Sequence, residues 1–339
     1  MKVGILGTGA YGLALASVFE ENGNDVTMWT KFKEEKNELL LNKFTPKLPG
    51  FIMSDSINIT TNFKKCVQNK NLIVIAVPTA FVDDVSKELK KYLKKEQHIC
   101  IASKGIEQNT CRFVYDVVEN NTKSENIGII SGPSFAIDVV KKVPIGLSLG
   151  CKNMQTTNII KKSLENKHFK LRETDDVIGI EICGSIKNVI AIAAGIVDGM
   201  NLPISTKALL ITESLNDIKL LIKELNGNER TILSFAGFGD ILLTCTSPKS
   251  RNYSFGQLVG KNVSKTQIDN YLKTTTVEGV YTLKSIFKLI NKENIEMPLI
   301  NLIYEIIFGD KNPNELLKFL IEKWSKIFRS FFITHVYGH

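Results

Sequence analysis

The stretch VGILGTGAYGLALASVFEENG, from Val3 to Gly23, decides the fold of this chain. A short apolar run ends at a glycine, a glycine-rich turn follows, and apolar residues then recur at helical spacing. The order of strand, glycine turn and helix matches the GxGxxG fingerprint of dinucleotide-binding folds. A bare GxGxxG also occurs by chance, but here the sequence agrees with the fingerprint on both sides. We therefore predict a dinucleotide site at the start of the chain.

The three fingerprint glycines have separate tasks. Gly7 permits a tight turn, Gly9 lets the backbone approach a pyrophosphate, and Gly12 allows the helix to pack closely on the strand. The pyrophosphate is then expected at the positive end of the helix.

The second expected strand, residues 25–29, bears on which dinucleotide binds. An Asp or Glu at its end would bond the ribose 2′-hydroxyl of NAD. The residues directly after it are instead Thr30, Lys31, Phe32 and Lys33. Because positive charge suits a 2′-phosphate, we expect NADP to be accepted alongside NAD. We favour the interpretation that NADP is preferred. The alternative is that Lys31 and Lys33 simply face solvent.

Strand and helix patterns alternate over about the first half of the chain. Further strands are expected at residues 72–77, 99–102, 127–130, 146–149 and 169–171. The alternation predicts an α/β doubly wound (Rossmann) domain over residues 1–174. Right-handed crossovers bring the strand ends to one edge, so Lys104 and the loop SGPSFA, residues 131–136, should line the ligand site.

After about Glu173 only helical periodicity remains, which predicts an all-α domain over residues 175–323. The expected helices are 177–199, 203–226, 230–243, 254–260, 265–272, 277–291, 298–307 and 312–323. Residues 324–339, rich in aromatics, stay unassigned.

One lysine stands out in the first of these helices. Lys187 lies within VIGIEICGSIKNVIAIAAGIVDGM, residues 177–200, a run of apolar and small residues. A buried ammonium group needs a partner, loses its proton, or is placed for a ligand. The alternative is that Lys187 extends along its own stem to solvent. The small residues of this run leave room for another helix or a ligand to approach the backbone.

The segment AGFGDILLTCTSPKSRNYSFG, residues 236–256, holds a second set of polar residues. Two glycines flank a turn that presents Asp240. The triplet Ser250, Arg251 and Asn252 can bind phosphate, because arginine offers a bidentate fork and its neighbours add neutral donors. The same triplet is also a common loop composition.

Length and composition indicate a soluble protein of two domains. The chain has 339 residues, 43% hydrophobic and 23% charged, and no signal peptide precedes the first strand, so we expect a cytoplasmic protein. Six scattered cysteines and four histidines argue against a disulfide framework and a metal site. The net charge of +8 comes from lysines spread along helices, so no nucleic-acid partner is expected. Polar residues interrupt the run at 177–200, so no membrane insertion is expected.

Five motifs follow in the order typical of one family: GTGAYG (7–12), SGPSFA (131–136), EICGSIKNVIAIAAGIVDGM (181–200), FAGFGDILLTCTSPKSRNYSFG (235–256) and VEGV (277–280). With them the chain closely resembles bacterial NAD(P)-dependent glycerol-3-phosphate dehydrogenases over residues 1–323. The resemblance implies reduction of dihydroxyacetone phosphate to sn-glycerol 3-phosphate for glycerophospholipid synthesis, and it leaves monomer and homodimer open.

The resemblance also assigns roles to residues of this chain. It makes Lys187 the general acid/base. Matches to the family's substrate positions are Lys104, Gly132, Ser134, Lys187, Asp240, Ser250, Arg251 and Asn252. Matches to its cofactor positions, with the fingerprint glycines, are Gly7, Gly9, Ala10, Tyr11, Gly12, Lys31, Lys104, Ala136, Arg251, Thr276 and Glu278.

Some of these positions depart from the family pattern. Ala10 stands where serine is frequent, Lys31 for Arg or His, Ser134 for threonine and Thr276 for valine. The weaker fork at Lys31 puts the NADP preference in doubt. Two other readings stay open: a Rossmann reductase of the ketopantoate or 3-hydroxyacid type, which would not need the 250–252 triplet, and a non-catalytic NAD(P) sensor, which would not need Lys187.

Overall fold

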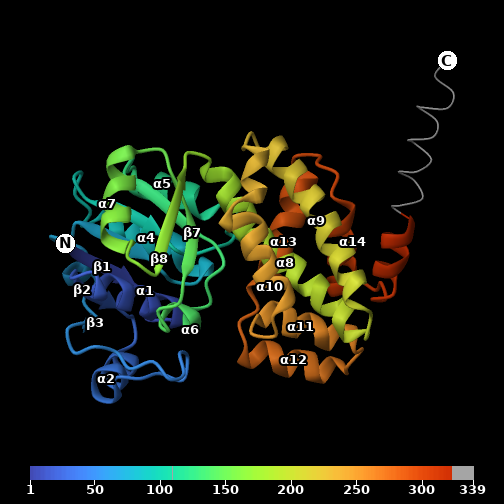
Figure 1. Ribbon diagram of the computed structural model, residues 1–339, viewed down its shortest axis with the longest axis horizontal. Coiled ribbons are helices and arrows are strands. Elements are labelled where there is room, and N and C mark those ends of the chain that lie inside the picture. The colour runs from blue at the N-terminus through green and yellow to red at the C-terminus, as the bar shows by residue number, and fades with distance from the viewer. Residues whose placement is uncertain (109, 323–339) are drawn as a thin grey trace. The chain divides into compact units, whose positions relative to one another are not determined.

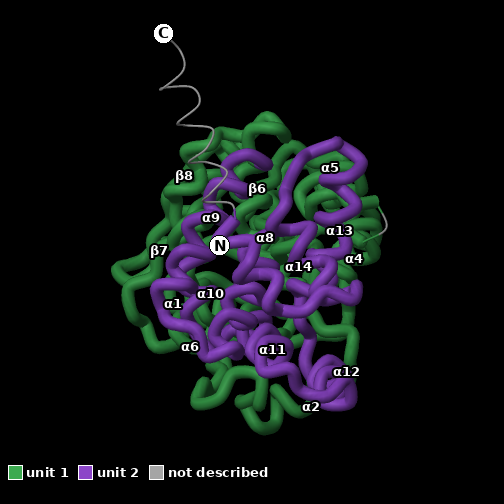
Figure 2. The backbone as a smooth tube through the Cα atoms, turned by 90° about the vertical axis from the view of Figure 1, so that its right-hand side faces the viewer, with its two compact units in different colours: residues 1–185, 222–240 green, residues 186–221, 241–339 purple. Residues whose placement is uncertain are grey.

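The computed structural model describes residues 1–108 and 110–322. The described chain divides into two compact units (Figure 2). Unit 1 comprises Met1–Ser185 and Ile222–Asp240, and unit 2 comprises Ile186–Leu221 and the chain from Ile241 onward. The aromatic segment 324–339 lies outside the described residues.

Unit 1 contains an eight-stranded sheet in the order β3-β2-β1-β4-β5-β6-β7-β8. Figure 1 labels the strands at the two ends of this sheet, β3 and β8. The strands are β1 (Lys2–Leu6), β2 (Asp25–Trp29), β3 (Asn58–Thr60), β4 (Leu72–Ile75), β5 (His98–Ile101), β6 (Ile127–Ser131), β7 (Ile145–Cys151) and β8 (Phe169–Thr174). The order from β3 to β6 is that of a doubly wound dinucleotide-binding fold, with the change of direction between β1 and β4. The predicted fold class is therefore confirmed.

Two features of the sheet were not predicted. The short strand β3 pairs with β2, although its three residues carry too little pattern to be recognised. β7 runs antiparallel to β6 and parallel to β8, whereas the other neighbouring pairs are parallel. A buried apolar run does not encode its own direction, so only the paired structure could settle this.

Helices cover the sheet and bury its apolar side chains. They are α1 (Ala10–Glu21), α2 (Lys33–Asn42), α3 (Phe63–Val67), η1 (Thr79–Phe81), α4 (Val82–Lys90), α5 (Val114–Thr122), α6 (Ala136–Val139) and α7 (Met154–Leu164). Val3 and Ile5 of β1 pack in one core with α1, while a Cβ on Gly4 would face α3. The two-residue alternation therefore holds within the buried run from Val3 to Ile5.

The second half of the chain is helical. Its helices are α8 (Val177–Gly199), α9 (Ile204–Glu224), η2 (Glu229–Leu233), η3 (Phe235–Gly239), α10 (Asp240–Thr246), α11 (Arg251–Gly260), α12 (Lys265–Thr274), α13 (Glu278–Lys292) and α14 (Pro298–Phe308). Residues 315–322 are also helical.

The predicted helix at 230–243 is wrong in detail, because the chain there forms η2, η3 and the start of α10 in succession. Gly237 interrupts it with φ −83° and ψ −109°, and a Cβ at this residue would lie 2.2 Å from the Ile232 carbonyl oxygen. Glycine is thus required where the chain bends back against its own preceding turn.

Helix α8 is the one described helix that is long and apolar enough to cross a membrane by length and composition, and 89% of its apolar window is buried in the protein. A buried core helix meets the same criteria.

The predicted domain boundary at 174/175 was drawn from the change of sequence pattern, whereas the two units are defined by contacts between residues. That boundary therefore stays a prediction.

Candidate active site

The glycine turn has the geometry that its sequence predicts. Gly7 has φ +121°, and a Cβ there would lie 2.7 Å from the Ala76 carbonyl oxygen. A Cβ on Gly12 would lie 2.5 Å from the Gly7 carbonyl oxygen, so α1 packs against the turn more closely than any other residue allows. The first glycine makes the turn and the third makes the close contact.

Gly9 differs from both, because a Cβ on it would meet nothing within 4 Å. It is the N-cap of α1, with no side-chain capping bond and no acidic residue in the first turn, where Ala10 and Tyr11 stand. The first N–H groups of a twelve-residue helix have no partner within the helix and make this end positive, and the space beside Gly9 is open. This cradle fits the pyrophosphate of a nicotinamide dinucleotide.

The end of β2 holds a residue that sequence reasoning missed. Glu35 Oε2 accepts hydrogen bonds from Thr8 Oγ1 at 2.8 Å and from Thr30 Oγ1 at 2.5 Å, and Lys47 bonds the other carboxylate oxygen. An acid thus lies beside both the fingerprint and the end of β2. The signal was hidden because Glu35 stands in the first turn of α2, and only the helix brings it back to the strand end.

The two predicted lysines after β2 are exposed, as is Phe32 at 62%. Burial raises the pKa of Glu35, but the hydrogen bonds from Lys47, Thr30 and Thr8 outweigh it and hold the pKa below its usual value. The carboxylate is therefore charged at neutral pH.

Lys104 lies just beyond the end of β5 and is joined to Asp240, which is 136 residues away in the sequence. Its Nζ is 2.9 Å from Asp240 Oδ2 and 3.4 Å from the Gly132 carbonyl oxygen. The Lys104 side chain is 15% exposed and that of Asp240 is 2% exposed. Three predicted site residues of unit 1 are thus brought together.

The loop after β6 carries the next predicted residues. Gly132 has φ +158°, and a Cβ there would lie 2.9 Å from a Leu147 side-chain carbon. Ser134 Oγ lies 3.0 Å from the Tyr11 hydroxyl and donates to the Gly132 carbonyl oxygen at 3.2 Å. Ala136 begins the short helix α6. The Ser134–Tyr11 contact ties this loop to the first turn of α1, and burial raises the pKa of Tyr11, so its hydroxyl stays protonated.

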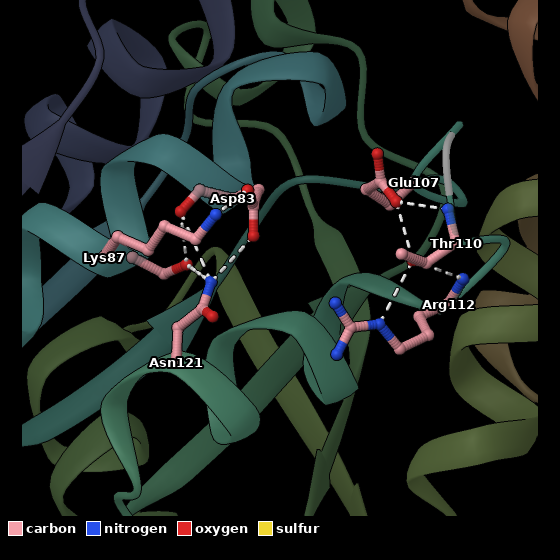
Figure 3. A network of polar contacts seen from close by, with 7 residues as sticks. Asp83, Lys87, Glu107, Thr110, Arg112 and Asn121 are labelled. Carbon is pink, nitrogen blue, oxygen red and sulfur yellow. Dashed lines mark hydrogen bonds and ion pairs between the residues drawn. The ribbon is translucent and has the colours of Figure 1, made fainter.

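The loop that follows Lys104 is closed by its own polar contacts (Figure 3). Glu107 Oε2 accepts from Thr110 N at 2.7 Å and from Thr110 Oγ1 at 2.6 Å, and Arg112 Nε donates to Thr110 Oγ1 at 3.1 Å. An isolated bridge pairs Ile106 with Phe113 at the base of the loop. These contacts restrain the chain directly after the lysine.

In unit 2, Lys187 is buried, with 8% exposure, and its Nζ donates to Thr244 Oγ1 of α10 at 3.3 Å. The side chain therefore does not extend along its own stem to solvent, and that alternative is wrong. The small residues around it have the predicted use. Cβ atoms on Gly195 of α8 and Gly256 of α11 would lie 2.1 Å and 2.0 Å from backbone oxygens of the facing helix, so the two helices pack backbone to backbone.

The triplet at 250–252 begins a helix and is not a loop, as α11 starts at Arg251 and not at the predicted residue 254. Ser250 is its N-cap and accepts from Tyr253 N at 3.3 Å, and the Arg251 side chain is exposed in the first turn. Asn252 is buried; it donates to Asn188 Oδ1 at 2.9 Å and accepts from Gly279 N at 2.8 Å.

The Asn188–Asn252 bond has a consequence for unit 2. Lys187 precedes one partner and Arg251 precedes the other, so this bond fixes a buried lysine and an exposed arginine on adjoining turns of two closely packed helices. Because α11 begins there, its positive end adds to the arginine as an anion site. The Gly279 bond ties the same asparagine to the start of α13, beside Glu278 and shortly after Thr276.

Within residues 1–108 and 110–322, no group of three His, Cys, Asp or Glu side chains is placed to hold a metal ion. The cysteines of the described residues form no disulfide, and burial raises the pKa of Cys66 to about 12.

The fold and these residues define a class, the two-domain nicotinamide-dinucleotide oxidoreductases with a Rossmann sheet and a helical second domain. Sequence profiles described as the N-terminus and the C-terminus of NAD-dependent glycerol-3-phosphate dehydrogenase match residues 2–157 and 176–318. The chain belongs to this family.

Individual relatives agree over nearly the whole length. The chain is 36% identical to an NAD(P)+-dependent glycerol-3-phosphate dehydrogenase of Fusobacterium nucleatum over 332 residues, 96% of this chain and 98% of the relative. It is 35% identical to that of Staphylococcus epidermidis, with 96% and 99% covered. The crystal structure of glycerol-3-phosphate dehydrogenase from Coxiella burnetii superposes with a TM-score of 0.89 at 30% identity, covering 95% of this chain and 98% of the other.

Proposed function

We propose that this protein reduces dihydroxyacetone phosphate to sn-glycerol 3-phosphate with NADH or NADPH and so supplies glycerophospholipid synthesis. The observation that carries the proposal is the Asn188–Asn252 bond, which joins the residue after the buried Lys187 to the residue after the exposed Arg251 at the start of α11. A phosphorylated ketone has the two groups that this arrangement suits, an anion and a carbonyl that takes up a proton.

Lys187 is the proposed general acid. The reduced nicotinamide, when bound, would supply the hydride that C2 of the ketone takes up. The electron pair of the carbonyl bond moves to oxygen, and the ammonium group of Lys187 gives that oxygen its proton. Before the proton moves, the positive charge stabilises the developing alkoxide, which is worth most in a buried site.

Lys104 and Asp240 are proposed to bind the substrate rather than to react. Lys104 offers a positive charge and N–H donors to the carbonyl or hydroxyl oxygens, and Asp240 holds it by a charge-assisted hydrogen bond of 2.9 Å. The backbone at Gly132 and the hydroxyl of Ser134 complete this proposed set. The phosphate is proposed to bind at Ser250, Arg251 and Asn252. Asn252 already uses one N–H and its side-chain oxygen in hydrogen bonds to Asn188 and Gly279.

The cofactor contacts are proposed at the fingerprint residues with Lys31, Lys104, Ala136, Arg251, Thr276 and Glu278. We further propose a cytoplasmic enzyme that forms a homodimer or stays monomeric. Cysteines that form no disulfide among the described residues, and the burial of the apolar window of α8, support a cytoplasmic location.

A spectrophotometric assay tests the function. Purified protein and NADH or NADPH should lose absorbance at the reduced-nicotinamide band when dihydroxyacetone phosphate is added, and not when ketopantoate is added. Turnover of ketopantoate alone would overturn the proposal in favour of a ketopantoate reductase, and cofactor binding with no turnover of either would favour a sensor.

The role of Lys187 has its own test. Lys187→Met keeps an unbranched side chain of similar length, so packing in α8 is preserved while the proton donor is lost. Turnover should fall by about 100-fold or more, with NADH binding unchanged. Lys288→Met, which removes an exposed lysine from α13, is the matched control and should keep wild-type turnover. Wild-type rates in Lys187→Met would remove the assignment.

A further inference from the structure

We propose that Glu35 is a specificity-determining residue that makes this enzyme favour NAD(H) over NADP(H). The inference rests on the proposed use of a nicotinamide dinucleotide and concerns only the choice between two cofactors that the family accepts. It replaces the expectation, drawn from Lys31 and Lys33, that NADP is preferred.

The position of the carboxylate carries the inference. Glu35 Oε2 accepts from Thr8, which lies between the first two fingerprint glycines, and from Thr30, which directly follows β2. β1 and β2 are paired in parallel, with Leu6 opposite Trp29, so these two threonines extend the same edge of the sheet. In this fold the adenosine ribose lies between the glycine turn and the end of the second strand. Glu35 spans that gap.

The carboxylate is also held in place. Two threonine hydroxyls fix one oxygen and Lys47 bonds the other, so three of its roughly four acceptor positions are used and one remains for a ribose hydroxyl. The Glu35 side chain is 20% exposed, and that of Lys47 is 57% exposed. Because the Lys47 side chain is largely exposed, solvent screens its positive charge, and that charge only partly offsets the negative charge of Glu35.

The energetic consequence differs between the two cofactors. A ribose 2′-hydroxyl can donate to the remaining acceptor position. A 2′-phosphate has no proton to donate there and brings negative charge against a fixed carboxylate, which is unfavourable wherever water is partly excluded. Lys31 and Lys33 are exposed on either side of Phe32, so solvent screens the attraction that they offer to the phosphate.

The neighbouring residue provides a matched control. Glu34 stands in the same first turn of α2 but is exposed. Glu34→Gln and Glu35→Gln therefore remove the same charge from the same helix turn, and only the second removes it from the threonine pair. Glutamine keeps a carbonyl oxygen that can accept from the hydroxyls, so the local fold should survive.

The experiment is direct titration of NADH and NADPH, followed by nicotinamide fluorescence and by calorimetry without substrate. Wild type should bind NADH about tenfold more tightly than NADPH. Glu35→Gln should lower that ratio about tenfold by strengthening NADPH, and Glu34→Gln should leave it unchanged.

Several outcomes would overturn the inference. They are an unchanged ratio in Glu35→Gln, an equal change in Glu34→Gln, and a wild type that binds NADPH as tightly as NADH or more tightly. The wild-type ratio decides the matter even if Glu35→Gln does not fold. A wild type that binds neither dinucleotide would instead remove the proposed function itself.

Discussion

Substitution by alanine should impair different properties at two glycines that stand three residues apart. At Gly9 the backbone has φ −68° and ψ 169°, which alanine adopts freely, and a Cβ would meet nothing within 4 Å. At Gly12 a Cβ would lie 2.5 Å from the Gly7 carbonyl oxygen, in the backbone of the tight turn. We expect Gly9→Ala to impair cofactor binding and Gly12→Ala to impair folding.

The magnitudes follow from these distances. Gly9→Ala should change the free energy of unfolding by less than about 1 kcal/mol, because two small effects oppose each other. Alanine stabilises the fold by restricting the unfolded chain, and it destabilises the fold because it is a poorer N-cap than glycine. Its methyl group would occupy the open space where we expect the pyrophosphate to approach. Losing one charge-assisted hydrogen bond there costs about 1.5–3 kcal/mol, a rise in Kd for NADH of about 10- to 150-fold. Gly12→Ala forces α1 off the turn, and such overpacking costs about 1–3 kcal/mol or more.

Thermal unfolding and fluorescence titration of NADH, run on both variants, separate the two effects. Gly12→Ala should lower Tm by several degrees, at about 2–4 °C per kcal/mol for a domain of this size, and Gly9→Ala should not. Wild-type NADH affinity in Gly9→Ala would refute the open-cradle reasoning. A wild-type Tm in Gly12→Ala would refute the packing argument.

Two further changes probe unit 2. Arg251→Ala should raise the KM for dihydroxyacetone phosphate at least about tenfold, with Arg251→Lys intermediate because it keeps the charge but loses the fork; a similar loss with unphosphorylated dihydroxyacetone would contradict a phosphate contact. Asp198 accepts from Lys207 at 2.8 Å, and this hydrogen bond holds its pKa below the ordinary 3.8 although burial opposes it. Since the folded-state pKa is the lower one, the stability it contributes is present above about pH 4 and is lost as the pH falls through the folded value. In urea unfolding, Asp198→Asn should lose stability at pH 7 but much less at pH 3, whereas the exposed Asp310→Asn should show no such difference.

Most of the fold could be predicted from the sequence because the sequence patterns that specify it are local. The fingerprint glycines, the apolar runs of strand length and the helical spacing each describe a few consecutive residues, and their alternation restricts the architecture. β2 was predicted with its observed bounds, and α8 ended at the expected residue. The prediction of a single helix over residues 230–243 was wrong, because at Gly237 contact with the preceding turn overrides the helical spacing.

The candidate site was accessible only in part. Lys187, Lys104 and the triplet at 250–252 could be singled out by residue type and by resemblance, and their assigned roles remain predictions. Glu35 could not, because its importance depends on the path of α2 after the strand and not on a motif.

The sequence by itself determined which segments become strands and helices and that a glycine turn opens a dinucleotide fold, since those properties depend on neighbours along the chain. Only the tertiary structure decided which distant residues meet. It joined Lys104 to Asp240 across 136 residues and Asn188 to Asn252 across 64, set Glu35 between two threonines, and turned β7 against β6. The physical reason is that a hydrogen bond or ion pair depends on distances of about 3 Å between atoms whose separation along the chain carries no information about them.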